Sequence, residues 1–212
     1  MSANHAAFNL IFRFVENYIS PIAGRISSQR HVMAIRDGFI SAMPFMIVGS
    51  FLLVFAYPPF SPDTTWGFAR AWLDLAKEFE GRILTPFDMT MGIMSIYICA
   101  AISYNLGKHY EKSNQLDPFM CAMLSIMAFL LIAAPKTNGT LPVDSLGGTG
   151  IFTAILVAIY CVEMMRFLKA HNIGIRLPDQ VPPMIKNSFD LLIPVLVVVL
   201  TLYPLSQFIQ HH

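Results

Sequence analysis

Residues 191–205 read LLIPVLVVVLTLYPL, and this run contains no Asp, Glu, Lys or Arg. Eleven of its residues are Leu, Ile or Val. Each of these favours bilayer insertion by about 0.3–0.6 kcal/mol at the centre of a helix. The uncharged stretch continues to residue 212, and a helix needs roughly 20 mostly apolar residues to cross a hydrocarbon core about 30 Å thick. Residues 191–212 therefore predict a membrane span.

Four further stretches of 18 residues or more also lack charged side chains: 38–62, 89–107, 118–135 and 145–162. Charged residues make up 13% of the chain, against about 25% in an ordinary soluble domain. The hydrophobic class reaches 55%, which leaves too little polar surface to cover a water-soluble fold. The sequence predicts an all-α membrane protein with five transmembrane helices.

Two amphipathic segments lie outside the predicted spans. Residues 6–20 have apolar side chains at helical spacing on one face, and the pattern is expected to end at Pro21. This helix is predicted either to lie on the cytoplasmic membrane surface or to pack on the protein's own cytoplasmic face. Residues 66–80 place Trp66 and Trp72 opposite a charged face. Because indole prefers the headgroup level, this segment predicts an interfacial helix on the outer side. Sugar stacking by the two Trp side chains is the less favoured alternative.

The basic residues are distributed unevenly among the predicted loops. The net charge of +1 gives no indication of nucleic acid or of an acidic substrate. Ten of the fourteen Lys and Arg residues fall on one alternating side of the spans. The positive-inside rule assigns that side to the cytoplasm. The N-terminus is therefore predicted inside and the C-terminus outside, with residues 1–37 as a cytoplasmic segment and residues 38–212 as a membrane domain.

Few side chains in this sequence are candidates for chemistry. Glu163 is the one serious ionisable candidate within a predicted span, but Arg166 at i+3 favours a local ion pair over a functional role. The six His residues fall in predicted loops or at the termini. The three Cys residues have no metal-ligand spacing and are expected to be buried core residues. No catalytic residue, metal site or cofactor is predicted.

Several positions are structural or hinge candidates. Pro44 lies within the first span and is expected to kink it. In the loop before the last span, Pro178 and Pro182 restrict the backbone, and Asp179 is expected to cap the following helix. Ser95, Cys99 and Ser103 recur at four-residue spacing in the second span. Packing or local backbone bonding is favoured for this stripe, and a cavity lining is the alternative.

Two strings near the end of the chain carry a resemblance. Residues 175–183 read IRLPDQVPP and residues 188–194 read SFDLLIP. They closely resemble the IIC permease component of bacterial phosphotransferase systems, in the lactose, cellobiose and chitobiose group. The strings HVMAIRDGFI at 31–40 and MGIMS at 91–95 resemble the same family in matching order, and Val162 to Met164 resembles the end of its fourth span.

The resemblance implies a sugar permease in the bacterial cytoplasmic (inner) membrane. Such a permease imports a β-linked disaccharide and hands it to a cytoplasmic IIB phosphocarrier protein. The resemblance also implies a homodimer whose scaffold is the N-terminal half. The family's sugar site, with its His and Glu ligands, lies in a C-terminal half that has no counterpart here. The chain is therefore expected to be truncated and not transport-competent alone. The alternative is a stand-alone membrane scaffold or assembly subunit without substrate, and a small independent transporter is disfavoured.

Overall fold

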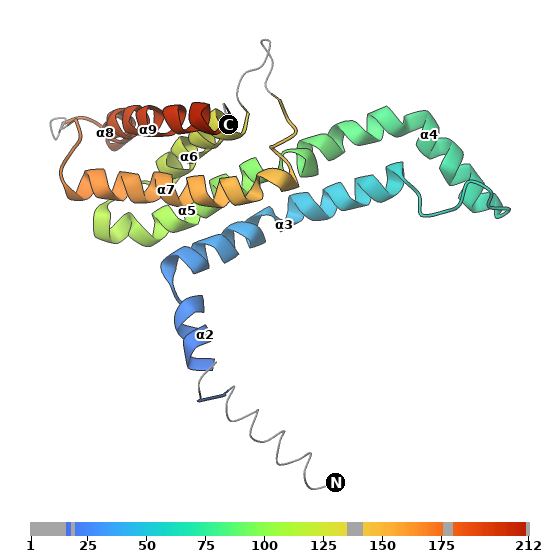
Figure 1. Cartoon of the computed structure of the whole chain (residues 1–212), viewed down its shortest axis with the longest axis horizontal. Helices are drawn as coiled ribbons and strands as arrows, with labels where there is room; N and C mark the ends of the chain where they lie inside the picture. The colour runs from blue at the N-terminus through green and yellow to red at the C-terminus, as the bar shows by residue number, and fades with distance from the viewer. Residues whose placement is uncertain (1–15, 18–19, 135–141, 176–179, 211–212) are drawn as a thin grey trace, which may run out of the picture.

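The computed structural model describes residues 16–17, 20–134, 142–175 and 180–210, which form helices and the turns that join them. In chain order the elements are α2 Ser20–Ser27, α3 Arg30–Ala56, α4 Gly67–Phe87, the π-helical turn η2 Asp88–Gly92, α5 Met94–Asn114, α6 Pro118–Ala133, the short 3₁₀ turn η3 Gly148–Gly150, α7 Ile151–Ala170, α8 Pro183–Asp190 and α9 Leu192–Gln210. Figure 1 shows α5, α6, α7 and α9 gathered into a bundle, with α3 and α4 extending beyond it.

By length and composition, four segments of the described chain are able to cross a bilayer: Arg30–Ala56, Gly67–Asn114, Gly148–Ala170 and Ser188–Phe208. Within the remaining expected span, residues 118–135, the structure has α6, an apolar helix of 16 residues from Pro118 to Ala133. At 1.5 Å per residue, α6 is about 24 Å long, which is shorter than a typical span. The all-helical prediction is confirmed, with four long apolar helices and one shorter apolar helix.

The helices extend beyond the uncharged stretches that predict them. Helix α3 begins at Arg30, ahead of residue 38, and α5 continues to Asn114, past residue 107. The absence of charge marks the part suited to hydrocarbon, whereas local capping ends the helix. Gln115 has φ 53°, a left-handed conformation that ends α5. The Asp117 side chain then accepts bonds from the backbone N–H of Phe119 at 2.9 Å and of Met120 at 3.3 Å, which caps α6.

The expected end of the N-terminal amphipathic helix at Pro21 stays a prediction, because residues 18–19 lie outside the described part of the chain. Pro21 lies in the first turn of α2, where proline is tolerated because its missing N–H would have no helical partner. Most of residues 6–20 lie outside the described part of the chain. The described α2 is exposed along its whole length and points away from the bundle (Figure 1).

The amphipathic helix expected over residues 66–80 is present and longer, because α4 runs from Gly67 to Phe87. Its small residues Ala69 and Ala76 are buried, and α4 packs mainly on α3. Asp74, Lys77 and Glu78 are exposed on the opposite face. The period of the sequence pattern therefore identified which side of α4 is buried.

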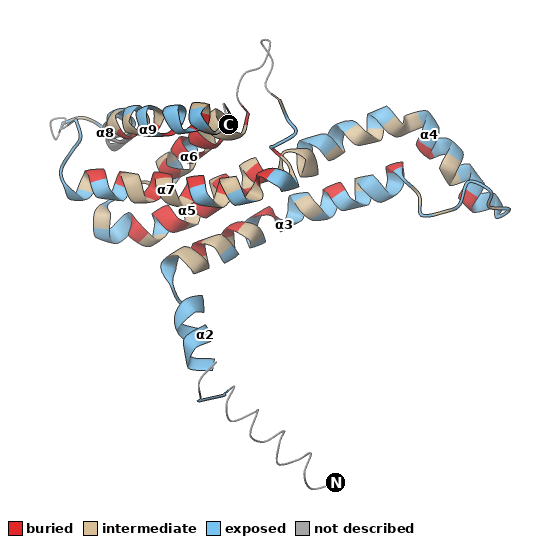
Figure 2. Cartoon of the chain, viewed as in Figure 1, coloured by how far each residue is buried: buried red, intermediate tan, exposed pale blue. Residues whose placement is uncertain are grey.

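The core lies where α5 meets α3, α6 and α7 (Figure 2). Ile98, Ile102 and Leu106 form the fully buried stripe of α5. At Gly38 the backbones of α3 and α5 approach so closely that an added Cβ would lie 2.4 Å from Cγ1 of Ile102 and 2.9 Å from its backbone nitrogen. Small residues allow this kind of close approach between membrane helices.

Polar and sulfur-containing residues in the core behave as packing residues. Cys99, Cys121 and Cys161 are free and fully buried, as predicted. In the second predicted span, Ser103 donates to the carbonyl of Cys99 at 2.8 Å, and the hydroxyl of Ser95 donates to the carbonyl of Gly147. Both Ser side chains are fully buried. These contacts agree with the favoured interpretation of the stripe, packing with bonds to its own or a neighbouring backbone: Ser103 bonds its own helix, and Ser95 bonds the segment that leads into α7.

Candidate functional site: a carboxylate cluster at one end of the bundle

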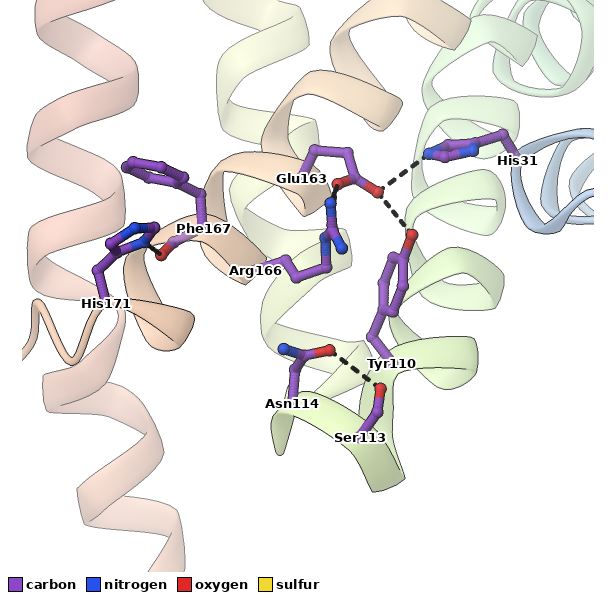
Figure 3. Close-up of polar contacts among 8 residues, drawn as sticks. All are labelled: His31, Tyr110, Ser113, Asn114, Glu163, Arg166, Phe167 and His171. Carbon is purple, nitrogen blue, oxygen red and sulfur yellow. Dashed lines mark hydrogen bonds and ion pairs between the residues drawn. The ribbon is translucent and has the colours of Figure 1, made fainter.

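The most connected charged side chain that the structure describes is Glu163, near the C-terminal end of α7. It lies at the end of the bundle where α3 and α6 begin and where α5 and α7 finish, here called the Glu163 end. Three side chains converge on its carboxylate: His31 from the first turn of α3, Tyr110 from α5 and Arg166 from α7 (Figure 3). We call Glu163 and these three residues the Glu163 cluster.

The two carboxylate oxygens of Glu163 divide the donors between them. Oε1 accepts from the Tyr110 hydroxyl at 2.7 Å and lies 3.0 Å from Nε2 of His31. Oε2 accepts from Nε of Arg166 at 2.7 Å and from its terminal NH₂ group at 2.6 Å. Because an ionised carboxylate only accepts, the geometry assigns a proton to Nε2 of His31.

Two guanidinium groups lie near the ring of Tyr110. The Arg166 carbon Cζ is 5.0 Å from the ring centroid, and that of Arg30 is 5.6 Å away. Both distances are within the range of cation–π attraction. Tyr110 itself is buried, so its ring contributes packing as well as a hydroxyl donor. Positive charge from α3 and α7 therefore lies close to the tyrosine ring whose hydroxyl donates to Glu163.

This geometry makes Glu163 a structural cross-link. Each of its oxygens already takes two donors, which leaves little capacity to accept a further proton or a substrate hydroxyl. Charge-assisted hydrogen bonds, such as those from Arg166 to Oε2, are the stronger hydrogen bonds in proteins. The side chain of Glu163 is 25% exposed, so the pair is only partly desolvated. The arrangement ties α3, α5 and α7 together at one end.

A second polar link lies beside the cluster. The Lys169 ammonium donates to the backbone carbonyl of Gln115 at 2.8 Å and pairs with Asp190 at 3.2 Å, which joins the ends of α5, α7 and α8. A cavity of about 510 Å³ opens next to this link, with Asn114, Asn172 and Lys186 among its lining residues. The Glu163 end therefore has a hollow with polar and charged walls.

The structure accounts for some of the predicted site residues. Glu163 forms the expected pair with Arg166, and it also has partners in two other helices that the sequence did not reveal. Pro44 lies inside α3 as expected. Pro182 is exposed just ahead of α8, and its carbonyl accepts from the backbone N–H of Ile185 and Lys186. Pro178 and Asp179 lie outside the described residues, so their predicted rigidity and capping stay predictions.

The placement of the His residues needs a correction. His31 lies in the first turn of α3 and His109 lies within α5, although both were expected in loops. The error arose because the helices start earlier and end later than the uncharged stretches. The sequence gives no sign of two further partners. Tyr110 bonds Glu163 across 53 positions, and Asp190 pairs with Lys169 across 21 positions, and nothing in their local sequence marks either contact. Among the described residues, no group of three or more His, Cys, Asp or Glu is placed to hold a metal ion.

A family model and individual relatives of this chain point to the same family of proteins. The family described as "Phosphotransferase system, EIIC" matches residues 36–211. The chain is 35% identical to the cellobiose-specific EIIC component of Geobacillus stearothermophilus, over 88% of this chain and 43% of the relative. It is 31% identical to the lichenan permease IIC component of Bacillus subtilis (strain 168), over 88% of this chain and 42% of the relative.

A solved structure shares both the fold and the sequence pattern. The crystal structure of the transporter ChbC, the IIC component of an N,N'-diacetylchitobiose-specific phosphotransferase system, matches with a TM-score of 0.76 and 32% identity. The match covers 94% of this chain and 48% of ChbC. The chain thus spans less than half the length of these relatives. Its matched residues and its helical arrangement show that it is a multi-pass membrane protein that belongs to the phosphotransferase system EIIC family, in the lactose, cellobiose and chitobiose group.

Proposed function

We propose that this chain forms the N-terminal membrane half of a sugar permease of the phosphoenolpyruvate-dependent phosphotransferase system. The observation that carries the proposal is the match to ChbC, which covers nearly the whole of this chain but about half of ChbC. The names of the relatives refer to cellobiose, lichenan and N,N'-diacetylchitobiose, which all contain β-linked sugar units. The proposed substrate is therefore a β-linked disaccharide such as cellobiose, chitobiose or lactose.

The proposed membrane arrangement has five crossings, formed by α3, α5, α6, α7 and α9. The short α6 is mostly surrounded by α5, α7 and α9, and a bilayer accommodates a short span by local thinning at modest cost. The exposed charges of α4 support an interfacial position for that helix on the outer side. The exposed isoleucines of α2, Ile22 and Ile26, support contact with the cytoplasmic membrane surface. In this proposal residues 1–37 precede a membrane domain of residues 38–212.

The Glu163 end is proposed to face the cytoplasm of a bacterial inner membrane. Basic side chains gather at this end, which supports that orientation by the positive-inside rule. They are Arg30, Arg36, Lys112, Arg166, Lys169 and Lys186. An alkaline phosphatase reporter fused after Gln210 is then expected to be active, whereas the same reporter fused after Ser28 is expected to be inactive. Activity of the Ser28 fusion with silence of the Gln210 fusion would reverse the orientation.

Two partners belong to the proposal. Membership of the EIIC family implies a cytoplasmic IIB phosphocarrier protein that phosphorylates the sugar as it is released.

A homodimer is proposed through the membrane helices, because α3 and α9 present rows of large exposed apolar side chains. Those rows include Ile40, Met43, Ile47 and Phe51 on α3 and Leu192, Leu196 and Leu200 on α9. The chain carries no cofactor in this proposal.

A chimera tests the proposed function. Residues 1–212 replace the matching N-terminal part of the full-length cellobiose-specific relative, and uptake of labelled cellobiose is measured in cells that supply the other phosphotransferase components. We expect phosphoenolpyruvate-dependent accumulation from the chimera and none from the 212 residues expressed alone. A chimera that inserts into the membrane at the level of the intact relative but accumulates no sugar would contradict the proposal and favour the second candidate, a membrane scaffold without substrate.

A further inference from the structure

Residues 45–87 form an arm that extends beyond the bundle (Figure 1). It consists of α3 after Pro44, the connecting loop and α4. The two limbs of the arm are joined to each other by several contacts. Tyr57 donates to Glu80 at 3.0 Å, which raises the pKa of the Tyr57 hydroxyl, and the indole N–H of Trp72 donates to the carbonyl of Phe55 at 3.3 Å. Buried Ala56, Ala69 and Ala76 allow close packing between the limbs. These contacts hold the two limbs of the arm against each other.

Each limb joins the rest of the protein at a point where regular helical hydrogen bonding is lost, here called an interruption. α3 stays helical through Pro44, but this residue lacks the N–H that would bond the carbonyl one turn earlier. In the other limb three features follow one another: Pro86 within α4, the π-helical turn η2, and Ile93 with non-helical angles of φ −120° and ψ 23°. Proline and π-helical turns are the usual positions at which helices bend.

Hydrogen bonds hold α5 in place immediately after the second interruption, residues 86–93. The backbone N–H of Ser95 donates to the carbonyl of Leu146 at 2.9 Å, and its hydroxyl donates to the carbonyl of Gly147. These bonds hold the first turn of α5 against the segment that leads into α7. Any change of direction between α4 and α5 therefore falls on residues 86–93, which are on the arm side of Ser95. The Thr90 hydroxyl bonds the carbonyls of Pro86 and Phe87, which satisfies backbone groups that the irregular turn leaves free.

The two interrupted points lie at the same level of the molecule and share one contact residue. The ring of Tyr97 in α5 stacks on Phe45, with centroids 4.4 Å apart and an interplanar angle of 11°. The hydroxyl of Tyr97 donates to the carbonyl of Met89 in η2 at 2.7 Å. Phe45 follows Pro44 directly and Met89 lies within η2, so one tyrosine contacts the chain at both interruptions.

We infer that the arm pivots as a rigid body about a paired hinge, made by Pro44 in α3 and residues 86–93, and that Tyr97 latches it in the position seen here. The inference concerns motion within this chain and does not depend on sugar transport. Hinges are a few positions that absorb a backbone change between rigid bodies. Removing the latch should free the arm, whereas replacing the hinge prolines should stiffen it.

Pulsed electron spin resonance on the whole chain in lipid nanodiscs tests this inference. One spin label at Leu75 on the arm is paired with one at Leu156 on α7, because both side chains are exposed. The native cysteines are buried and are not expected to react with the label. Tyr97→Ala should broaden the Leu75–Leu156 distance distribution, because it removes the contacts with Phe45 and Met89. Tyr97→Phe, which keeps the ring, should give a smaller change. The double variant Pro44→Ala, Pro86→Ala should narrow the distribution.

Two control pairs separate hinge motion from loss of structure. A Val48–Leu75 pair lies within the arm, and a Met123–Leu156 pair lies within the bundle; all of these positions are exposed. Both distributions should stay unchanged in every variant. The inference is overturned if Tyr97→Ala leaves the Leu75–Leu156 distribution as narrow as that of the bundle pair. It is also overturned if the Val48–Leu75 distribution broadens equally, because the arm would then be bending internally.

Discussion

The Nε2 atom of His31 lies 3.0 Å from Oε1 of Glu163, although 132 positions separate the two residues in the chain. This contact fastens the first turn of α3 to the last turns of α7. It is reinforced by Tyr110 and Arg166, so the carboxylate links three helices at the point where they leave the predicted spans. The pairing gives the Glu163 end a defined geometry that apolar packing alone does not specify.

Loss of the carboxylate should lower stability more than loss of an exposed ion pair. Glu163→Ala leaves three donors without their acceptor, and we expect a cost of about 1–3 kcal/mol. Glu163→Gln should cost less, because the amide oxygen still accepts. Arg36→Ala breaks the exposed pair with Asp37 and should cost at most about 1 kcal/mol. Thermal unfolding in detergent measures all three variants. Equal midpoints for Glu163→Ala and Arg36→Ala would contradict the proposed cross-link.

His31 and Tyr110 should be energetically coupled through the shared oxygen of Glu163. In a double-mutant cycle of His31→Ala and Tyr110→Phe, we expect a coupling energy of about 0.5–1 kcal/mol. Tyr110→Phe keeps the ring beside Arg166 and removes only the hydroxyl, so it isolates the hydrogen bond. Strictly additive effects on unfolding would show that the two donors act independently.

Gly38 should tolerate no side chain. A Cβ there meets both the side chain and the backbone of Ile102, so trimming Ile102 cannot relieve the whole clash. We expect Gly38→Ala to destabilise the bundle by about 1–3 kcal/mol. Gly81→Ala is the matched control, because Gly81 lies within α4 and a Cβ added there would have no other group within 4 Å. That change should stabilise by about 0.5–1 kcal/mol. The two unfolding midpoints should therefore move in opposite directions.

The thiols should report on folding. Cys99, Cys121 and Cys161 are fully buried where α5, α6 and α7 meet. A maleimide dye should therefore label the folded protein negligibly and label it fully after denaturation in sodium dodecyl sulfate. Ser28→Cys, which introduces an exposed thiol outside the proposed membrane crossings, should label at once and serves as the positive control. Rapid labelling of the native protein without this substitution would show that the helices pack differently.

The helical class, the apolar segments and the buried side of α4 were all predictable from the sequence. They follow from local properties, since hydropathy over about 20 residues and a 3.6-residue period belong to each segment alone. The sequence also identified Glu163 and its neighbour Arg166, which lie one turn apart. It misplaced the start of α3, and with it His31, and the end of α5, because both helices continue past the uncharged stretches into charged sequence.

Only the tertiary structure decided which distant side chains meet. The partners of Glu163 in α3 and α5, the contact of Gly38 with Ile102, and the position of Tyr97 between Phe45 and Met89 join segments whose local sequences carry no sign of each other. Hydropathy specifies that a helix enters the bilayer, but it is nearly symmetric about the helix axis in these segments. Which face turns toward which neighbour is set by the fit of small residues and by a few polar bonds, and these form only when the helices pack.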